Sequence, residues 1–124
     1  MTEASARSVS LAIPPKPDYI VLARLALSAI CRLTPLEPDD VADLKLAVSE
    51  VATERLAGAS EGPVHLSFAL EDDRLVVDLH AGAAPAGRED ALSRAIVEAT
   101  VDEVIYDESS VRLVKRLPDS EPEA

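Results

Sequence analysis

Two glutamates of one predicted helix are the residues of this chain whose type and spacing could do chemistry. Glu50 and Glu54 are four residues apart, so on an α-helix they stand one turn apart on a face that Asp43 shares. A carboxylate can act as a general base, a pair can divide the acid and base roles, and carboxylates also bind magnesium. Like charges at this spacing mildly destabilise an isolated helix. The pair is therefore either used by the fold or solvated, and no other motif supplies a substrate pocket for a carboxylate-pair enzyme.

The helix that must position these glutamates is predicted over residues 41–58. Its apolar residues recur every three or four positions, which places them on one buried stripe. The stripe is formed by Val41, Leu44, Val48 and Val51. Pro38 and the acidic residues Asp39 and Asp40 favour a helix start, and Gly58 is a natural stop.

Hydropathy patterns predict two further helices and five strands around this helix. In chain order they are a strand at 8–13, a helix at 18–33 with Asp18 as N-cap, a hairpin of strands at 63–70 and 74–80, a helix at 89–100, and strands at 103–106 and 109–117. The domain organisation predicted from these elements is a flexible N-terminus at 1–7, a single domain at 8–117 and a disordered acidic tail at 118–124.

Composition bounds the class of protein. A chain of 124 residues with 48% apolar content is long enough for one domain with a sizeable core and argues against disorder. No apolar run is long enough to span a membrane, the first ten residues lack a signal-peptide core, and one cysteine cannot form an internal disulfide. We therefore expect a soluble, cytoplasmic protein. No metal site is expected either, because His65 and His80 have no cluster of other ligands at suitable spacing.

The net charge of −11 disfavours nucleic-acid binding, because phosphate contacts need a basic surface. The same charge either favours basic protein partners or serves solubility alone.

The string KLAVSEVATE at residues 45–54, followed by a short acidic turn and two strands, resembles the N-box helix of the GHKL (Bergerat-fold) ATPases. It is similar in particular to the RsbW-type anti-sigma factors, which are also serine-protein kinases. The matching residues are Lys45, Ala47, Val48, Ser49, Glu50 and Thr53. The resemblance covers residues 8–117 and implies an α/β (α+β) fold, a two-layer sandwich with helices on one face of a mixed, mostly antiparallel sheet. It also gives Glu50 the position of the catalytic base.

The residues that the resemblance assigns to adenine and magnesium depart from the family pattern. Glu54 stands where the family has a magnesium-binding asparagine, and Ala81 stands where an aspartate recognises the adenine amino group. Ala83 and Pro85 replace the glycines of the same box. An alanine side chain cannot accept a hydrogen bond, and proline cannot adopt the positive φ that glycine allows.

The positions that would contact phosphate are also altered. The start of the helix at 89–100 has the residues ALS at 91–93 where the family has a glycine loop, and Glu89 and Asp90 place negative charge there. Ser109 or Ser110 would occupy the place of the family's phosphate-contacting hydroxyl. We therefore expect no bound cofactor, with Mg-ATP required only if the protein is an active kinase.

The helix at 18–33 carries a second candidate surface. Arg24, Ser28 and Arg32 follow one another at intervals of four and form a narrow polar stripe. The stripe is either a solvated edge or a contact surface for a partner. The resemblance implies the second, because the family presents a basic residue there to the sigma factor and its antagonist, and Arg24 matches it. Cys31 lies on the apolar part of this helix and is expected to be a core residue, not a reactive thiol.

The function predicted from these features is that of a bacterial anti-sigma factor or related partner-switch regulator of the stress-response type. It would sequester a sigma factor of RNA polymerase by protein–protein binding, without ATP binding or kinase activity. The resemblance adds a STAS-type anti-anti-sigma antagonist as a possible second partner, and a homodimer. The alternative is an active serine-protein kinase that phosphorylates the antagonist. There Glu50 would activate the serine hydroxyl and Glu54 would replace asparagine as a magnesium ligand.

Overall fold

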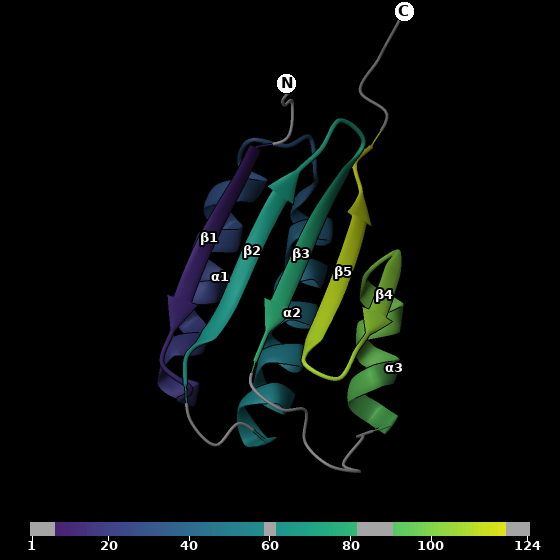
Figure 1. The fold of residues 1–124 in the computed structure, drawn as a ribbon. Helices are drawn as coiled ribbons and strands as arrows, with labels where there is room; N and C mark the ends of the chain where they lie inside the picture. The colour runs from purple at the N-terminus through teal and green to yellow at the C-terminus, as the bar shows by residue number, and fades with distance from the viewer. Residues whose placement is uncertain (1–6, 59–61, 82–90, 119–124) are drawn as a thin grey trace, which may run out of the picture.

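The computed structural model describes residues 7–58, 62–81 and 91–118 of the chain. Within these residues a five-stranded sheet is covered on one face by three α-helices (Figure 1). In chain order the elements are β1 (Arg7–Ile13), the short 3-10 helix η1 (Pro17–Tyr19), α1 (Ile20–Cys31), α2 (Pro38–Gly58), β2 (Val64–Leu70), β3 (Arg74–His80), α3 (Ala91–Thr100), β4 (Glu103–Tyr106) and β5 (Ser110–Arg116).

The sheet has the strand order β1-β2-β3-β5-β4, and all four pairings of the described strands are antiparallel. Two hairpins, β2–β3 and β4–β5, account for two of these pairings. The chain leaves β3, passes through α3 to the edge strand β4 and returns as β5, which is thereby inserted between β3 and β4 (Figure 1). The predicted two-layer α/β (α+β) class is confirmed, with antiparallel pairing throughout the described sheet.

Alternation along the strands decides which face the helices cover. On β2 the residues Val64, Leu66 and Phe68 are buried, whereas His65 is exposed and Ser67 is only partly buried. Successive strand residues point to opposite faces, so the apolar set of each strand packs under the helices. Burial of this apolar surface is the main favourable contribution to the stability of the fold.

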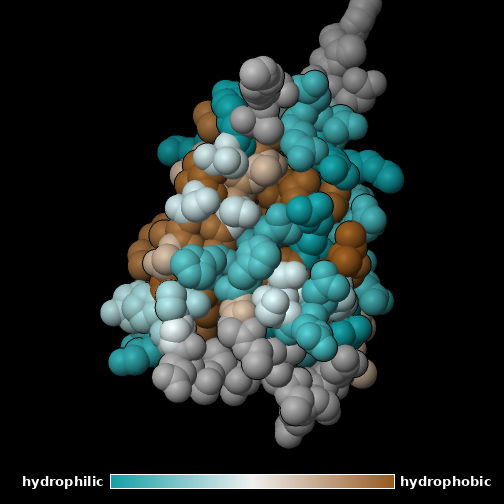
Figure 2. Space-filling view, viewed as in Figure 1, coloured by the Kyte–Doolittle hydropathy of each residue, from teal (hydrophilic) through white to brown (hydrophobic). Residues whose placement is uncertain are grey.

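The other face of the sheet carries its own polar cover. Val76 and Val114 are opposite one another on β3 and β5 and only 3% and 4% exposed, although no described helix lies over them. The next pair on the same face of these two strands is Asp78 and Arg112, which form an ion pair with two hydrogen bonds. Figure 2 shows this face as mainly hydrophilic across its middle, with hydrophobic surface gathered on the β1 and α1 side.

One helix prediction needs correction at its start. The helix at 18–33 divides into the 3-10 turn at Pro17–Tyr19 and α1, and neither turn nor helix has a side-chain N-cap bond, so Asp18 is not the cap. Pro17 at the first position fixes φ and lacks an N–H, which favours a tight turn there. The helix ends at Cys31, where the Thr34 hydroxyl donates a 2.7 Å hydrogen bond to the Cys31 carbonyl.

The other predicted elements are found within one to three residues of their expected bounds. Residues 89 and 90 of the helix expected at 89–100, and most of the tail expected at 118–124, lie outside the described residues. None of the described helices is long and apolar enough to cross a bilayer.

Candidate functional site

The middle helix α2 carries both predicted glutamates on the flank that faces α3 and β4. Glu50 and Glu54 are partly buried. Tyr106 of β4 shows that Glu54 faces this strand. Burial raises the pKa of the Tyr106 hydroxyl, and the negative charge of Glu54 raises it further. Glu54 therefore lies close to β4, and helical spacing places Glu50 one turn earlier on the same side of α2.

Arg55, the next residue along α2, is the main polar anchor of this region and was not anticipated from the sequence. Its side chain is only 5% exposed. One guanidinium nitrogen donates to the Glu108 carbonyl at 2.9 Å, and the other donates to the carbonyls of Asp107 at 2.9 Å and Ser110 at 3.5 Å. Arg55 thus fastens the β4–β5 turn to the C-terminal part of α2. Its spacing of four residues from Val51 and seven from Val48, both in the buried stripe of α2, was the signal that it points inward.

A cation–π contact lies beside this anchor. The Arg94 guanidinium of α3 is 3.8 Å from the centre of the Tyr106 ring. The Tyr106 hydroxyl is buried and has no hydrogen-bond partner among the described residues. The positive charge of Arg94 opposes the rise of the Tyr106 pKa, but burial is the larger influence and the pKa stays raised. The corner between α2, α3 and β4 therefore holds an aromatic ring, two arginines and Glu54 in close proximity.

Ala81, the residue at the position of the family's adenine-recognising aspartate, closes β3. It is 9% exposed, and its backbone N–H donates to the Ser109 carbonyl at 3.1 Å. The side chain at this position is a methyl group, and the backbone hydrogen bond to Ser109 extends the pairing between β3 and β5 by one residue. Ala83, Pro85, Glu89 and Asp90 lie outside the described residues.

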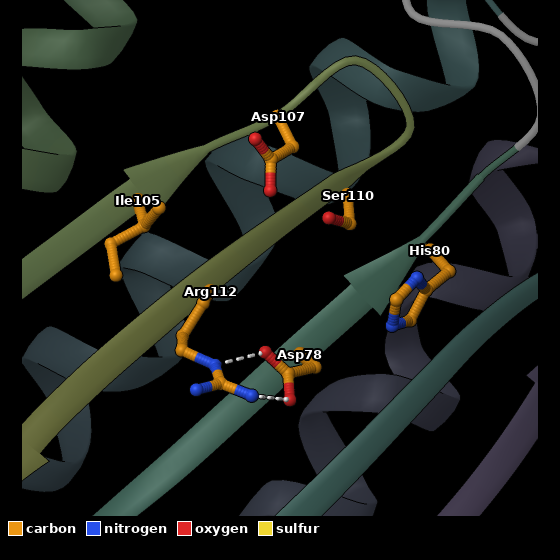
Figure 3. Close-up of a pocket in the computed structure, with 6 residues that line it drawn as sticks. All are labelled: Asp78, His80, Ile105, Asp107, Ser110 and Arg112. Carbon is orange, nitrogen blue, oxygen red and sulfur yellow. Dashed lines mark hydrogen bonds and ion pairs between the residues drawn. The ribbon is translucent and has the colours of Figure 1, made fainter.

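Ser110 lies on the opposite face of the sheet from Glu50 and Glu54. Its register partner on β3 is the exposed His80, whereas its neighbour Val111 is buried under the helices. Ser110 lines a shallow cavity of about 200 Å³ together with residues from β3, β4 and β5 (Figure 3). The lining residues are Asp78, His80, Ile105, Asp107, Ser110 and Arg112. The structure does not bring Ser110 together with the two glutamates.

The polar groups of this cavity are largely committed to one another. The Arg112 guanidinium donates from Nε and from a terminal nitrogen to the two carboxylate oxygens of Asp78, at 2.8 Å and 3.0 Å (Figure 3). Such a two-point pair occupies the face of the carboxylate that a ligand would use. Among the described residues there is no group of three or more His, Cys, Asp and Glu side chains that could hold a metal ion.

The first helix presents an apolar surface to solvent. Leu25 is 60% exposed and Val21 is 50% exposed, and Leu22 adds to the same surface. The predicted stripe runs alongside: Arg24 and Arg32 are exposed. Large aliphatic residues gathered on one exposed helix are typical of a surface that contacts another molecule.

Ser28, the middle member of the stripe, is partly buried and opens into a second cavity between α1 and α2. This groove has a volume of about 430 Å³. Its lining residues are Ser28, Cys31, Arg32, Thr34, Leu36, Pro38, Val41, Ala42 and Lys45. Burial raises the pKa of the Cys31 thiol, although the charge of Lys45 partly opposes this, so Cys31 forms a neutral wall of the groove.

No family model matches the chain, but comparison with curated proteins gives relatives named serine-protein kinase RsbW. The serine-protein kinase RsbW of Bacillus velezensis is 36% identical over 73 residues, which are 56% of this chain and 46% of that protein. The serine-protein kinase RsbW of Listeria monocytogenes serovar 1/2a is 33% identical over 73 residues, with the same shares. The chain thus spans about half the length of the curated relatives it matches.

A solved structure matches over more of the fold. The crystal structure of the RsbU and RsbW domains of Rv1364c from Mycobacterium tuberculosis superimposes with a TM-score of 0.75 at 16% identity, covering 90% of this chain and 32% of that chain. At this identity the match concerns the fold alone. The sequence relatives and the shared fold together confirm the resemblance of this chain to RsbW-type proteins.

Proposed function

We propose that this protein is a partner-binding regulator of the anti-sigma type, which sequesters a sigma factor of RNA polymerase through α1 and the adjoining edge of α2. The observation that carries the proposal is the exposed apolar surface of α1 with arginines beside it. The exposed side chains of this surface are Val21, Leu22 and Leu25. Burying them against a partner would lower the free energy by about 25 cal/mol per Å² of apolar surface removed from water. Arg24 and Arg32 add charge that selects the partner's orientation.

We further propose that the protein acts without Mg-ATP, because the chemistry of the described residues is a poor fit to that cofactor. Position 81 offers a methyl group to an adenine amino group. Glu50 and Glu54 would place two carboxylates close to a triphosphate, a repulsion that magnesium could offset only in part. The three hydrogen bonds of the Arg55 guanidinium go to carbonyls of the β4–β5 turn and not to these carboxylates.

A homodimer and a STAS-type anti-anti-sigma antagonist are also part of the proposal. The edge strand β1 supports the dimer: it pairs along all seven residues with β2, and its outer edge has no partner among the described strands. A long edge strand with no proline or inward charge in its interior is open to pairing with a second copy. The opposite edge strand, β4, has four residues and offers much less.

The test is capture of purified sigma factors by the immobilised full chain, with Arg24→Glu as the variant. We expect binding by the wild type and at least tenfold weaker binding by Arg24→Glu. Arg116→Glu makes the same charge change at an exposed site on the open face of the sheet and should bind as the wild type does. Failure of the wild type to capture any of the sigma factors would refute the proposal.

Nucleotide binding is tested separately by calorimetric titration with Mg-ATP and with Mg-ADP. We expect no heat of binding up to millimolar nucleotide. Micromolar binding would overturn the nucleotide-independent part of the proposal and favour the kinase alternative.

The kinase alternative has its own support in the relatives, which carry the name serine-protein kinase, and in Glu50, which keeps the position of the catalytic base. Its test is transfer of labelled phosphate to a candidate antagonist, compared between wild type, Glu50→Gln and Asp43→Asn. An active kinase requires transfer by the wild type and by Asp43→Asn, and its loss in Glu50→Gln. No transfer by the wild type would exclude it.

A further inference from the structure

The groove between α1 and α2 has a lining whose charge differs in sign from that of the whole chain. Two of its nine lining residues, Arg32 and Lys45, are cationic, and none is acidic, in a protein of net charge −11. The two cations come from different helices, Arg32 from the end of α1 and Lys45 from the second turn of α2. A cleft whose charges are of one sign raises the local concentration of ligands of the opposite sign.

Both cations are available to a ligand. Within the described residues, neither the Arg32 nor the Lys45 side chain forms a hydrogen bond or ion pair. Thr34, by contrast, is already engaged: its hydroxyl donates to the Cys31 carbonyl at 2.7 Å and accepts from the Leu36 N–H at 3.2 Å. The groups left for a ligand are thus the two cations and the Ser28 hydroxyl.

The floor between these cations is apolar. Cys31 is 4% exposed, and Leu36 and Val41 pack against the core while still lining the groove. Leu33, the residue after Arg32 in the chain, is an aliphatic side chain that is 60% exposed. A ligand that fits must therefore combine an aliphatic part with negative charge.

We propose that this groove holds an acidic segment of the partner protein, with an aliphatic side chain between Leu36 and Val41 and carboxylates against Arg32 and Lys45. The inference rests on the proposed function, because Ser28 and Arg32 belong both to the groove and to the α1 contact stripe. It extends the contact from the exposed surface of α1 into a defined recess. Arg24 lies outside the groove, so the two parts of the surface can be tested independently.

The test uses the full chain and a pair of short fluorescein-labelled peptides that alternate leucine with glutamate or leucine with lysine, followed by fluorescence polarisation. The glutamate peptide should bind and the lysine peptide should not. Arg32→Glu and Lys45→Glu should each weaken binding by about tenfold, since each replaces an attraction by a repulsion. Ala42→Trp, which places a large side chain at an exposed lining position, should abolish binding.

Matched controls separate the groove from general charge and folding effects. Arg116→Glu repeats the charge change on the open face of the sheet, and Ala95→Trp repeats the steric change at an exposed position of α3. Both should bind the glutamate peptide as the wild type does, and all variants should keep the circular dichroism spectrum of the wild type. The inference is overturned if the glutamate peptide does not bind, if Arg116→Glu weakens binding as much as Lys45→Glu, or if acetate at the same concentration displaces the peptide.

A parallel capture experiment with a sigma factor distinguishes this inference from the function on which it rests. If wild type, Lys45→Glu and Ala42→Trp capture the sigma factor equally well, the groove inference is wrong and the proposed function stands. If the wild type captures none, the proposed function fails, and the peptide titration alone decides whether the groove binds acidic segments.

Discussion

Removing the guanidinium of Arg55 should be among the most destabilising single changes outside the apolar core. Arg55 donates two hydrogen bonds of 2.9 Å and one of 3.5 Å to carbonyls of the β4–β5 turn. A hydrogen bond to a charged group contributes about 1.5–3 kcal/mol, and the longest of the three adds little. Because Asp107 and Glu108 are exposed, water can replace part of the lost donor, so the lower value applies. The expected loss for Arg55→Met is therefore about 3 kcal/mol from the two short bonds.

The assay is urea unfolding followed by far-ultraviolet circular dichroism, with thermal unfolding as a second measure. For a domain of this size a loss of 3 kcal/mol corresponds to a fall in Tm of roughly 10 °C. Arg55→Lys keeps the charge but offers a single ammonium in place of a fork, so about half of the loss is expected. Arg32→Met removes an exposed arginine and should change stability by less than about 0.5 kcal/mol. Equal stability of Arg55→Met and Arg32→Met would refute the anchoring role.

Four further predictions concern Tyr106, Asp78 and Cys31. Tyr106→Phe should leave stability unchanged or raise it by up to about 1 kcal/mol, because it removes a buried hydroxyl without a described partner. Because the folded-state pKa of Tyr106 is raised, the associated stability is fully present below the unfolded tyrosine pKa of about 10 and is lost as the pH rises through the higher folded-state pKa. Urea unfolding from about pH 8 to 11, with Tyr106→Phe as control, measures this loss. Asp78→Asn should cost less than about 1 kcal/mol, and the cost should shrink at high salt, since Arg112 is half-exposed; a cost above 2 kcal/mol would contradict a surface pair. Cys31 should react with a thiol reagent far more slowly in the folded than in the unfolded chain, because burial protects it and raises its pKa; equal rates would contradict this.

The elements of this fold were predictable where a local period carries the information. The stripe of α2 through Leu44 and Val48 repeats at helical spacing, and both residues are fully buried. The β2–β3 hairpin was predictable because Phe68 and Val77, which pair across it, each belong to an alternating run. The end of α1 at Cys31 was harder to predict from the sequence, since the Thr34 hydroxyl contributes to it through a hydrogen bond to the Cys31 carbonyl.

The candidate site was harder to predict because its residues are brought together by tertiary packing. Arg55 resembles a solvated charge until the β4–β5 turn, about fifty residues later, supplies its acceptors. Side chains alternate between the two faces along β5, so neighbouring residues point in opposite directions. Val111 and Leu113 are buried under the helices, which indicates that Ser110 points to the other face. The partnership of Arg32 and Lys45 across the groove depends on how α1 packs against α2, which no local pattern contains.

The two flanks of α2 carry opposite charge. This explains how a protein with a large negative net charge can bind an acidic segment of a partner. Lys45 lies on the flank toward α1, whereas Glu50 and Glu54 lie on the flank toward α3. At physiological salt, exposed charges farther apart than about 8 Å are largely screened, so a segment within the groove is governed by Arg32 and Lys45 and not by the net charge of −11. The net charge still acts on the approach, where it repels an acidic partner. Added salt should therefore speed association with such a partner while it also speeds dissociation, a combination that a uniformly acidic surface binding a basic partner would not give.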